Sequence, residues 1–141
     1  MTEPRERWYE RMRELYDRSP VHATLGMRLD ALAPGSATVL FEPRAEFQNV
    51  MGIVHGGTLA TVADSALLQA VRTLMGEDDR LTTLELKISY LAPARGDRFR
   101  CLGEVVRVGG STGVATATIT DADGEPVAAS LGTIHLKRAG R

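Results

Sequence analysis

A long apolar segment near the middle of the chain constrains the fold more than any other feature of the sequence. Eleven of the eighteen residues from Thr58 to Met75 are Leu, Val, Ala or Met, and only Asp64 and Arg72 are charged. A helix that is apolar on most of its sides must be covered on most of its sides. Since 141 residues are the length of one ordinary domain, we expect this segment to be the central, buried helix of a single core.

The segments around this helix are typical of β-strands joined by tight turns. Six segments carry the pattern: residues 27–32 and 36–42 before the helix, and residues 83–90, 98–108, 112–120 and 126–136 after it. Residues 20–26 between the N-terminal segment and the first strand read as irregular. Strands and helices do not alternate as they do in a parallel sheet, so the sequence predicts an α+β fold in which an antiparallel sheet wraps around the central helix.

The N-terminal segment predicts an additional amphipathic surface helix. Residues 3–18 interleave five acidic and five basic side chains at helical spacing. Four residues form a narrow apolar stripe on this helix: Trp8, Met12, Leu15 and Tyr16. We therefore expect residues 1–19 to form a helix that precedes the main domain, residues 20–141.

Charge and cysteine content exclude several classes of function. The net charge of −1 argues against a nucleic-acid partner, because such proteins usually carry an excess of basic side chains. The single cysteine, Cys101, cannot form an internal disulfide or a cysteine-rich metal site, which favours a reducing cytoplasm. No basic start followed by an apolar stretch is present, so we expect no export signal and no membrane association.

Asp64 is a candidate catalytic residue because an ionised carboxylate is costly to place in an apolar helix. A structural explanation is equally open: Asp64 could pair with Arg72 or with a strand residue, or meet solvent at a kink in the helix.

The segment from Asn49 to Gly57 brings an amide, the His55 imidazole and a glycine pair to the start of the same helix. Helix N-termini expose unpaired N–H groups that can stabilise negative charge on a carbonyl oxygen, so this is the outline of an oxyanion site. The alternative is that the glycines form a tight turn, that His55 caps the helix, and that Asn49 bonds its own backbone.

The spacing of these groups predicts how they could cooperate. Gly56 and Asp64 are eight residues apart, which corresponds to about 12 Å along a helix. The two groups of one chain are too far apart to act on one carbonyl. If they act together, the N-terminus of one helix must lie beside the middle of another, as in a two-fold homodimer with adjacent antiparallel helices.

The sequence resembles the hotdog-fold acyl-CoA thioesterases, specifically the PaaI-like (phenylacetate-pathway) group, over residues 20–136. Three features carry the resemblance: the motif Asn49-x-x-Gly52-x-x-His55-Gly56-Gly57, Asp64 nine residues after His55, and Thr83 followed by Ile88-Ser89-Tyr90-Leu91-Ala92-Pro93-Ala94. The resemblance implies a hotdog fold, here with an extra N-terminal helix, and dimers that commonly pair again into tetramers.

The resemblance also implies roles for individual residues. The Gly56 N–H, with Asn49 and His55 nearby, would bind and polarise a thioester carbonyl. Asp64 of the partner chain would act as a nucleophile or as a general base for water, and Thr83 would help to place that water or the carboxylate. The substrate would be an acyl-CoA or aryl-CoA, with no metal and no cofactor beyond the coenzyme A that the substrate carries.

The acyl-binding residues are less clearly indicated. Gly57 is a candidate substrate contact, and Phe47, Met51, Leu68 and Leu74 could line an acyl pocket, although they could equally be core residues. Ser65 and Cys101 are interpreted as packing residues rather than nucleophiles. Two rival functions stay open: a noncatalytic acyl-CoA-binding module, and a hotdog dehydratase or hydratase, which would need a catalytic histidine together with a carboxylate.

Overall fold

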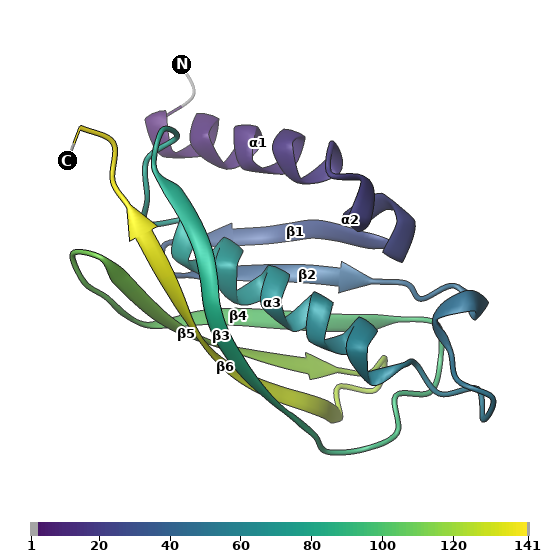
Figure 1. Ribbon diagram of the computed structural model, residues 1–141. Coiled ribbons are helices and arrows are strands. Elements are labelled where there is room, and N and C mark those ends of the chain that lie inside the picture. Colours follow the sequence, from purple (N-terminus) through teal and green to yellow (C-terminus); the bar gives the residue numbers. More distant parts are fainter. Residues whose placement is uncertain (1–2, 141) are drawn as a thin grey trace.

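The computed structural model describes residues 3–140 (Figure 1). Residues 1 and 2 of the predicted N-terminal segment and residue 141 of the predicted main domain therefore lie outside the described residues. The helical elements are α1 (Pro4–Asp17), α2 (Pro20–Leu25), the 3₁₀ turn η1 (Ala45–Phe47) and α3 (Gly56–Arg72). The strands are β1 (Met27–Ala33), β2 (Ser36–Phe41), β3 (Arg80–Tyr90), β4 (Phe99–Val108), β5 (Thr112–Thr120) and β6 (Pro126–Lys137).

The six strands form one sheet in the order β1-β2-β4-β5-β6-β3, with every neighbouring pair antiparallel. The sheet curls around α3, which lies in its concave face (Figure 1). Most of α3 is buried, as a helix with apolar residues on most of its sides requires. The predicted α+β architecture, an antiparallel sheet wrapped around a central helix, is confirmed.

Small residues let α3 and β4 approach each other closely. A side chain on Gly103 of β4 would collide with the backbone carbonyl of Ala66 in α3, so only glycine fits at this position. Since the carbonyl belongs to a helix backbone, it cannot move aside as a flexible side chain can. Gly103 therefore sets the distance between the sheet and the helix that carries Asp64.

We expect Gly103→Ala to destabilise the protein by about 3 kcal/mol, because the added methyl group must push α3 away from the sheet. Chemical denaturation of the purified variant measures this change. Gly110→Ala is the matched control, because a methyl group at Gly110 would meet no atom within 4 Å, and its stability should stay close to that of the unchanged chain. Equal stability of the two variants would contradict the close approach.

Helix α1 docks on the body of the protein through one face. Its buried residues are Tyr9, Met12 and Tyr16, and the hydroxyl groups of Tyr16 and Ser65 are hydrogen-bonded at 2.7 Å. The predicted helix is confirmed, but its stripe is corrected: Leu15 is 39% exposed and Tyr9 is buried instead. The i, i+3, i+7 face from Tyr9 to Tyr16 is the one turned inward. Ser65 is buried in this contact, which confirms its interpretation as a packing residue.

The largest differences from the predicted boundaries lie at α2, at the end of α3 and at the start of β3, which begins at Arg80 rather than at residue 83. Residues 20–25 form the short helix α2, which begins with Pro20 in the first turn and ends at Gly26, whose φ of 74° is in the left-handed region. Six residues span less than two turns, so they show no readable periodicity. Helix α3 ends at Arg72 rather than at Met75.

None of the helices within residues 3–140 is both long and apolar enough to cross a membrane.

Candidate functional site

The first turn of α3 is capped by the side chain of His55. Its Nδ1 accepts a hydrogen bond from the Gly57 N–H at 3.0 Å, so the predicted alternative in which His55 caps the helix is the observed arrangement. Because Nδ1 accepts, the proton of the neutral ring lies on Nε2. The Gly56 N–H donates to no group within residues 3–140. The cap therefore uses Gly57 and leaves Gly56 as a free donor at the start of the helix.

Asn49 lies in the loop before α3 and stabilises that loop. Its Oδ1 accepts from the Met51 N–H at 2.9 Å and from the Ile53 N–H at 3.2 Å. The alternative in which Asn49 bonds its own backbone is thus also observed. These bonds use only the amide oxygen, so they fix the direction of the side chain without using its NH₂ group.

A pocket of about 450 Å³ is lined in part by Gly56. Its lining residues come from the loop before α3, from α3, and from the end of β3 with the segment after it: Asn49, Ile53, Val54, Gly56, Leu59, Tyr90, Leu91, Ala92, Pro93 and Ala94. The lining is mostly apolar, so an apolar group with a carbonyl at its end could enter and meet a hydrogen-bond donor.

The predicted substrate contacts lie elsewhere. None of Gly57, Phe47, Met51 and Leu68 lines this pocket. Within the chain Gly57 and Met51 are exposed, and Phe47 and Leu68 are half-buried, so none of the four is a fully buried core residue. Sequence reasoning missed Leu59 and the segment 91–94 as lining residues, although the latter was part of the quoted motif.

Asp64 lies half-buried in the middle of α3, where its Oδ1 accepts a hydrogen bond from the Thr83 Oγ1 at 2.7 Å. The structure therefore brings together Asp64 and Thr83 as predicted. It also matches the structural explanation in which Asp64 pairs with a strand residue. Arg72 forms no ion pair with Asp64, and burial lowers the pKa of the Arg72 guanidinium.

A bulge in β3 decides which of its side chains face α3. The register with β6 shifts between Thr83 and Glu85, so that Thr83 pairs with Ile134 and Tyr90 pairs with Ala128. Strict alternation would place Thr83 and Tyr90 on opposite faces of the sheet. The extra residue brings both onto the helix-facing side, where both bond to α3.

Tyr90 is a site residue that sequence reasoning missed. Its hydroxyl donates to the Gly56 carbonyl oxygen at 2.6 Å, and its ring lines the pocket beside Gly56. In the sequence, Tyr90 was marked only by its place in the motif from Ile88 to Ala94, and this motif does not indicate which way the Tyr90 side chain points.

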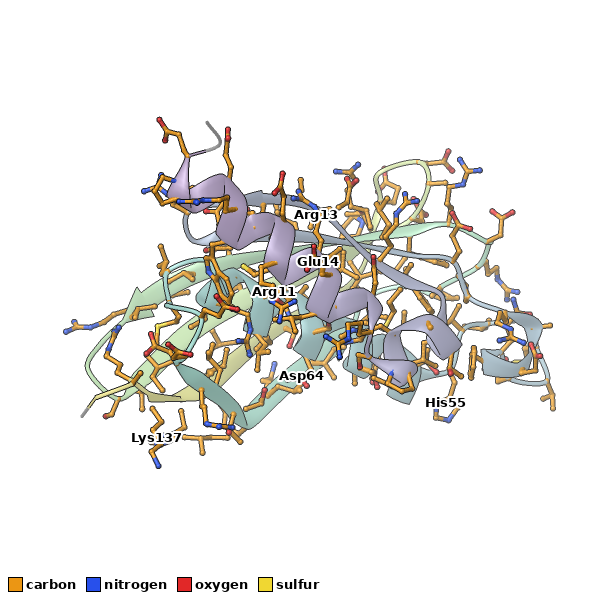
Figure 2. All side chains as sticks on the ribbon, turned by 90° about the horizontal axis from the view of Figure 1, so that it is seen from above. Arg11, Arg13, Glu14, His55, Asp64 and Lys137 are labelled. Carbon is orange, nitrogen blue, oxygen red and sulfur yellow. The ribbon has the colours of Figure 1, made fainter. Side chains whose placement is uncertain are left out.

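Within one chain, the start of α3 and Asp64 are separate. Figure 2 shows the labelled His55 and Asp64 side chains at different positions along α3. The eight residues from Gly56 to Asp64 span about 12 Å of helix. One chain thus presents two half-sites: a free donor with a pocket, and a carboxylate held by a threonine.

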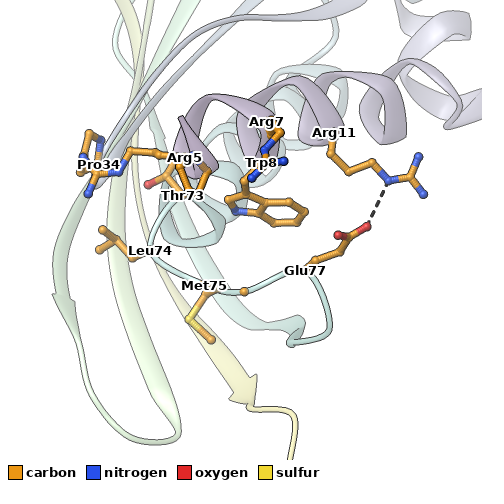
Figure 3. Close-up of a pocket in the computed structure, with 11 residues that line it drawn as sticks. Arg5, Arg7, Trp8, Arg11, Pro34, Thr73, Leu74, Met75 and Glu77 are labelled. Atoms are coloured by element: carbon orange, nitrogen blue, oxygen red, sulfur yellow. Dashed lines mark hydrogen bonds and ion pairs between the residues drawn. The ribbon is translucent and has the colours of Figure 1, made fainter. Parts of the chain in front are cut away.

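A larger pocket of about 580 Å³ lies at the opposite end of α3 (Figure 3). It is lined by the start of α1 and by the segment after α3, including Trp8, Leu74 and three arginines, of which Arg11 pairs with Glu77 at 3.2 Å. None of the predicted catalytic residues lines it. Leu74 therefore lies far from the start of α3 in the same chain.

Cys101 is buried, and burial raises the pKa of its thiol to about 12, so it is not an available nucleophile.

Comparison with known sequences gives consistent matches. A family model described as the thioesterase superfamily matches residues 51–128, more than half of the chain. A Halobacterium salinarum protein named as a candidate esterase is 40% identical over 87 residues, and the alignment covers 57% of each chain. The chain thus spans little more than half the length of this relative. The medium/long-chain acyl-CoA thioesterase YigI of Escherichia coli is 28% identical over 129 residues, covering 81% of this chain and 83% of YigI.

Solved structures match over nearly the whole chain. A crystal structure of a thioesterase family protein from Silicibacter pomeroyi has a TM-score of 0.88 at 36% identity and covers 94% of this chain and 99% of that chain. The PaaI protein of the Escherichia coli phenylacetic acid degradation operon has a TM-score of 0.83 at 23% identity and covers 94% of this chain and 93% of that chain. At this identity the second match is a likeness of fold alone.

Proposed function

Because the chain belongs to the thioesterase superfamily, we propose that it hydrolyses acyl-CoA or aryl-CoA thioesters to the free acid and coenzyme A. Membership confirms the hotdog fold predicted from the sequence. The observation that carries the proposal is the free N–H of Gly56, a residue at the start of α3 that also lines a mostly apolar pocket. A donor in this position is suited to a carbonyl oxygen that gains negative charge.

The proposed reaction needs one donor site and one carboxylate. The Gly56 N–H and the NH₂ group of Asn49 polarise the thioester carbonyl. Asp64 either attacks the carbonyl carbon itself or takes a proton from the water that attacks it. The C–S bond then breaks, and the thiolate of coenzyme A leaves with the electron pair and takes up a proton that comes from the water. Where Asp64 attacks directly, the acyl group is first held on Asp64 as a mixed anhydride, and water hydrolyses this anhydride to the free acid and restores the carboxylate. Since Thr83 donates to Oδ1 of Asp64, the second carboxylate oxygen is left for the reaction.

The two half-sites meet, in this proposal, across a homodimer. The free edge of the sheet supports such a contact: β3 is the last strand in the sheet order and is eleven residues long, and its Leu84 is 60% exposed. At the opposite edge, α1 runs alongside β1 (Figure 1), and the Arg13 guanidinium of α1 donates to the Asp30 carbonyl of β1 at 2.8 Å. Pairing of two β3 edges would place two α3 helices side by side. The Gly56 end of one helix would then lie beside Asp64 of the other, and such dimers could pair into tetramers.

The proposed dimer also brings together the residues that the sequence predicts to bind the acyl group. Leu68 is one turn beyond Asp64 on the partly exposed side of α3, while Phe47, Met51 and Gly57 lie near the start of α3. In the proposed dimer these two groups face each other from different chains and line the acyl group together.

No metal and no cofactor beyond the coenzyme A of the substrate takes part. The unpaired, buried Cys101 is consistent with a cytoplasmic location.

Release of free thiol from acetyl-CoA, octanoyl-CoA, palmitoyl-CoA and phenylacetyl-CoA tests the proposal. The name of YigI makes the medium and long chains the first choice, and the aromatic thioester tests the PaaI-like alternative. Tight binding of these thioesters without turnover would favour a noncatalytic acyl-CoA-binding module. A dehydratase is not favoured, because Nδ1 of the neutral His55 ring accepts the cap bond and Nε2 carries the proton, which leaves no nitrogen free to take a proton from a substrate carbon.

We expect Asn49→Asp to lower kcat by roughly 100-fold, because the change removes the NH₂ donor and leaves an oxygen to accept the two loop N–H groups. The melting temperature should change little, since those loop bonds are kept. Steady-state kinetics and thermal unfolding of the same preparation measure the two effects. Unchanged kcat would leave Asn49 with its loop role alone.

A further inference from the structure

The peptide group between Gly56 and Gly57 is held at both of its polar atoms. Its carbonyl oxygen accepts from the Tyr90 hydroxyl at 2.6 Å, and its N–H donates to the His55 Nδ1 at 3.0 Å. Glycine has the widest range of backbone conformations of any residue, so two consecutive glycines would otherwise leave this peptide mobile. The two side chains therefore add to the restraint that the first turn of α3 already places on these glycines.

The Tyr90 ring also lies directly against Gly56. A methyl group added to Gly56 would lie 3.0 Å from both the Cζ and the Oη of Tyr90. Tyr90 itself is 52% exposed, at the end of β3, so the hydrophobic core does not depend on it. The only side-chain hydrogen bond of Tyr90 in the part of the chain that the structure describes goes to the first carbonyl of α3. This contact orders the N-terminus of α3 rather than packing the interior.

We propose that Tyr90 is a positioning residue that fixes the direction of the free Gly56 N–H by clamping the adjacent peptide. The inference rests on the proposed function, in which that N–H stabilises the developing oxyanion. The Gly56 N–H lies in the preceding peptide, whose His55 carbonyl accepts from the Thr58 N–H at 3.0 Å and the Leu59 N–H at 3.2 Å. Because the two peptides share the Gly56 Cα, the restraint that Tyr90 places on the second peptide adds to these bonds in setting the direction of the N–H. The charge on the substrate oxygen grows only towards the transition state, so a misdirected donor should lower kcat and leave KM nearly unchanged.

Tyr90→Phe tests this role, with Tyr9→Phe as the matched control. Tyr9 is a buried tyrosine of α1 whose hydroxyl has no hydrogen-bond partner among the described residues, so its loss removes no hydrogen bond. With octanoyl-CoA as substrate, we expect Tyr90→Phe to lower kcat by about 10-fold with KM within about twofold of the unchanged chain. Both variants should melt cooperatively close to the temperature of the unchanged chain, and Tyr9→Phe should keep its kcat.

A second measurement does not depend on turnover. Hydrogen exchange of the Gly57 N–H, followed by NMR, should be several-fold faster in Tyr90→Phe than in Tyr9→Phe, because the peptide opens more often when its carbonyl is released. Unchanged kcat, a rise in KM alone, unchanged exchange, or loss of cooperative unfolding in Tyr90→Phe would each overturn the inference. If the unchanged chain hydrolyses none of the four thioesters, the proposed function fails, and the exchange rate still decides whether Tyr90 holds this peptide.

Discussion

Asp64→Asn is expected to lower kcat by about 10³-fold on whichever thioester the unchanged chain hydrolyses best. Asparagine has nearly the shape of aspartate and keeps an oxygen that can accept the Thr83 hydroxyl, but it can neither take a proton from water nor attack as a carboxylate. The loss should appear in kcat with little change in KM, since Asp64 acts on the reacting atoms. Initial rates of thiol release over a range of substrate concentrations measure both.

Stability separates this loss from unfolding. Asp64 is half-buried and accepts one side-chain hydrogen bond, so neutralising it removes an ion that is partly out of water and should not lower the melting temperature. Asp17→Asn is the matched control, because Asp17 is an exposed carboxylate at the end of α1. A kcat for Asp64→Asn within tenfold of this control would remove Asp64 from the mechanism.

The helical part of the site could be predicted because its signals are local. The apolar composition of α3 requires burial, and a charged Asp64 within it stands out without any knowledge of the sheet. The spacing between Gly56 and Asp64 follows from helix geometry alone. The contact between Asp64 and Thr83 came only from the resemblance, since no local pattern relates two residues that are 19 positions apart.

The contribution of β3 could not be predicted in the same way. One extra residue between Thr83 and Glu85 reverses the alternation of the strand, and nothing in the composition of this segment marks the bulge. Tyr90 was therefore quoted as part of a motif without a known direction. The loop before α3 also shows what the sequence could not decide. Asn49 and His55 each had a structural and a functional interpretation. The structure shows the structural bonds, and these bonds do not exclude the functional role.

A heterodimer of two variants that are each inactive as homodimers is expected to recover thioesterase activity, which is the second large effect. Gly56→Pro removes the proposed donor itself. Proline suits the first position of a helix, and its Cβ, which would lie 3.0 Å from the Tyr90 ring, also pushes aside this half-exposed side chain. The backbone of His55, with φ −58° and ψ 135°, suits a residue before proline. We expect Gly56→Pro and Asp64→Asn homodimers to be nearly inactive. Their heterodimer, isolated after co-expression with two different affinity tags, should recover about half of the unchanged activity per dimer.

The recovery follows from counting intact sites. In this heterodimer one site combines the unchanged Gly56 of the Asp64→Asn chain with the unchanged Asp64 of the Gly56→Pro chain, while the other site lacks both groups. A site built within a single chain would stay inactive in the same heterodimer. The reciprocal pair, an unchanged chain with a Gly56→Pro/Asp64→Asn chain, reverses the expectation: each shared site lacks one group, so activity should be lost, whereas a site within one chain would keep about half. Opposite outcomes from the same two substitutions distinguish a shared site from poor folding of either chain, which would lower activity in both pairings.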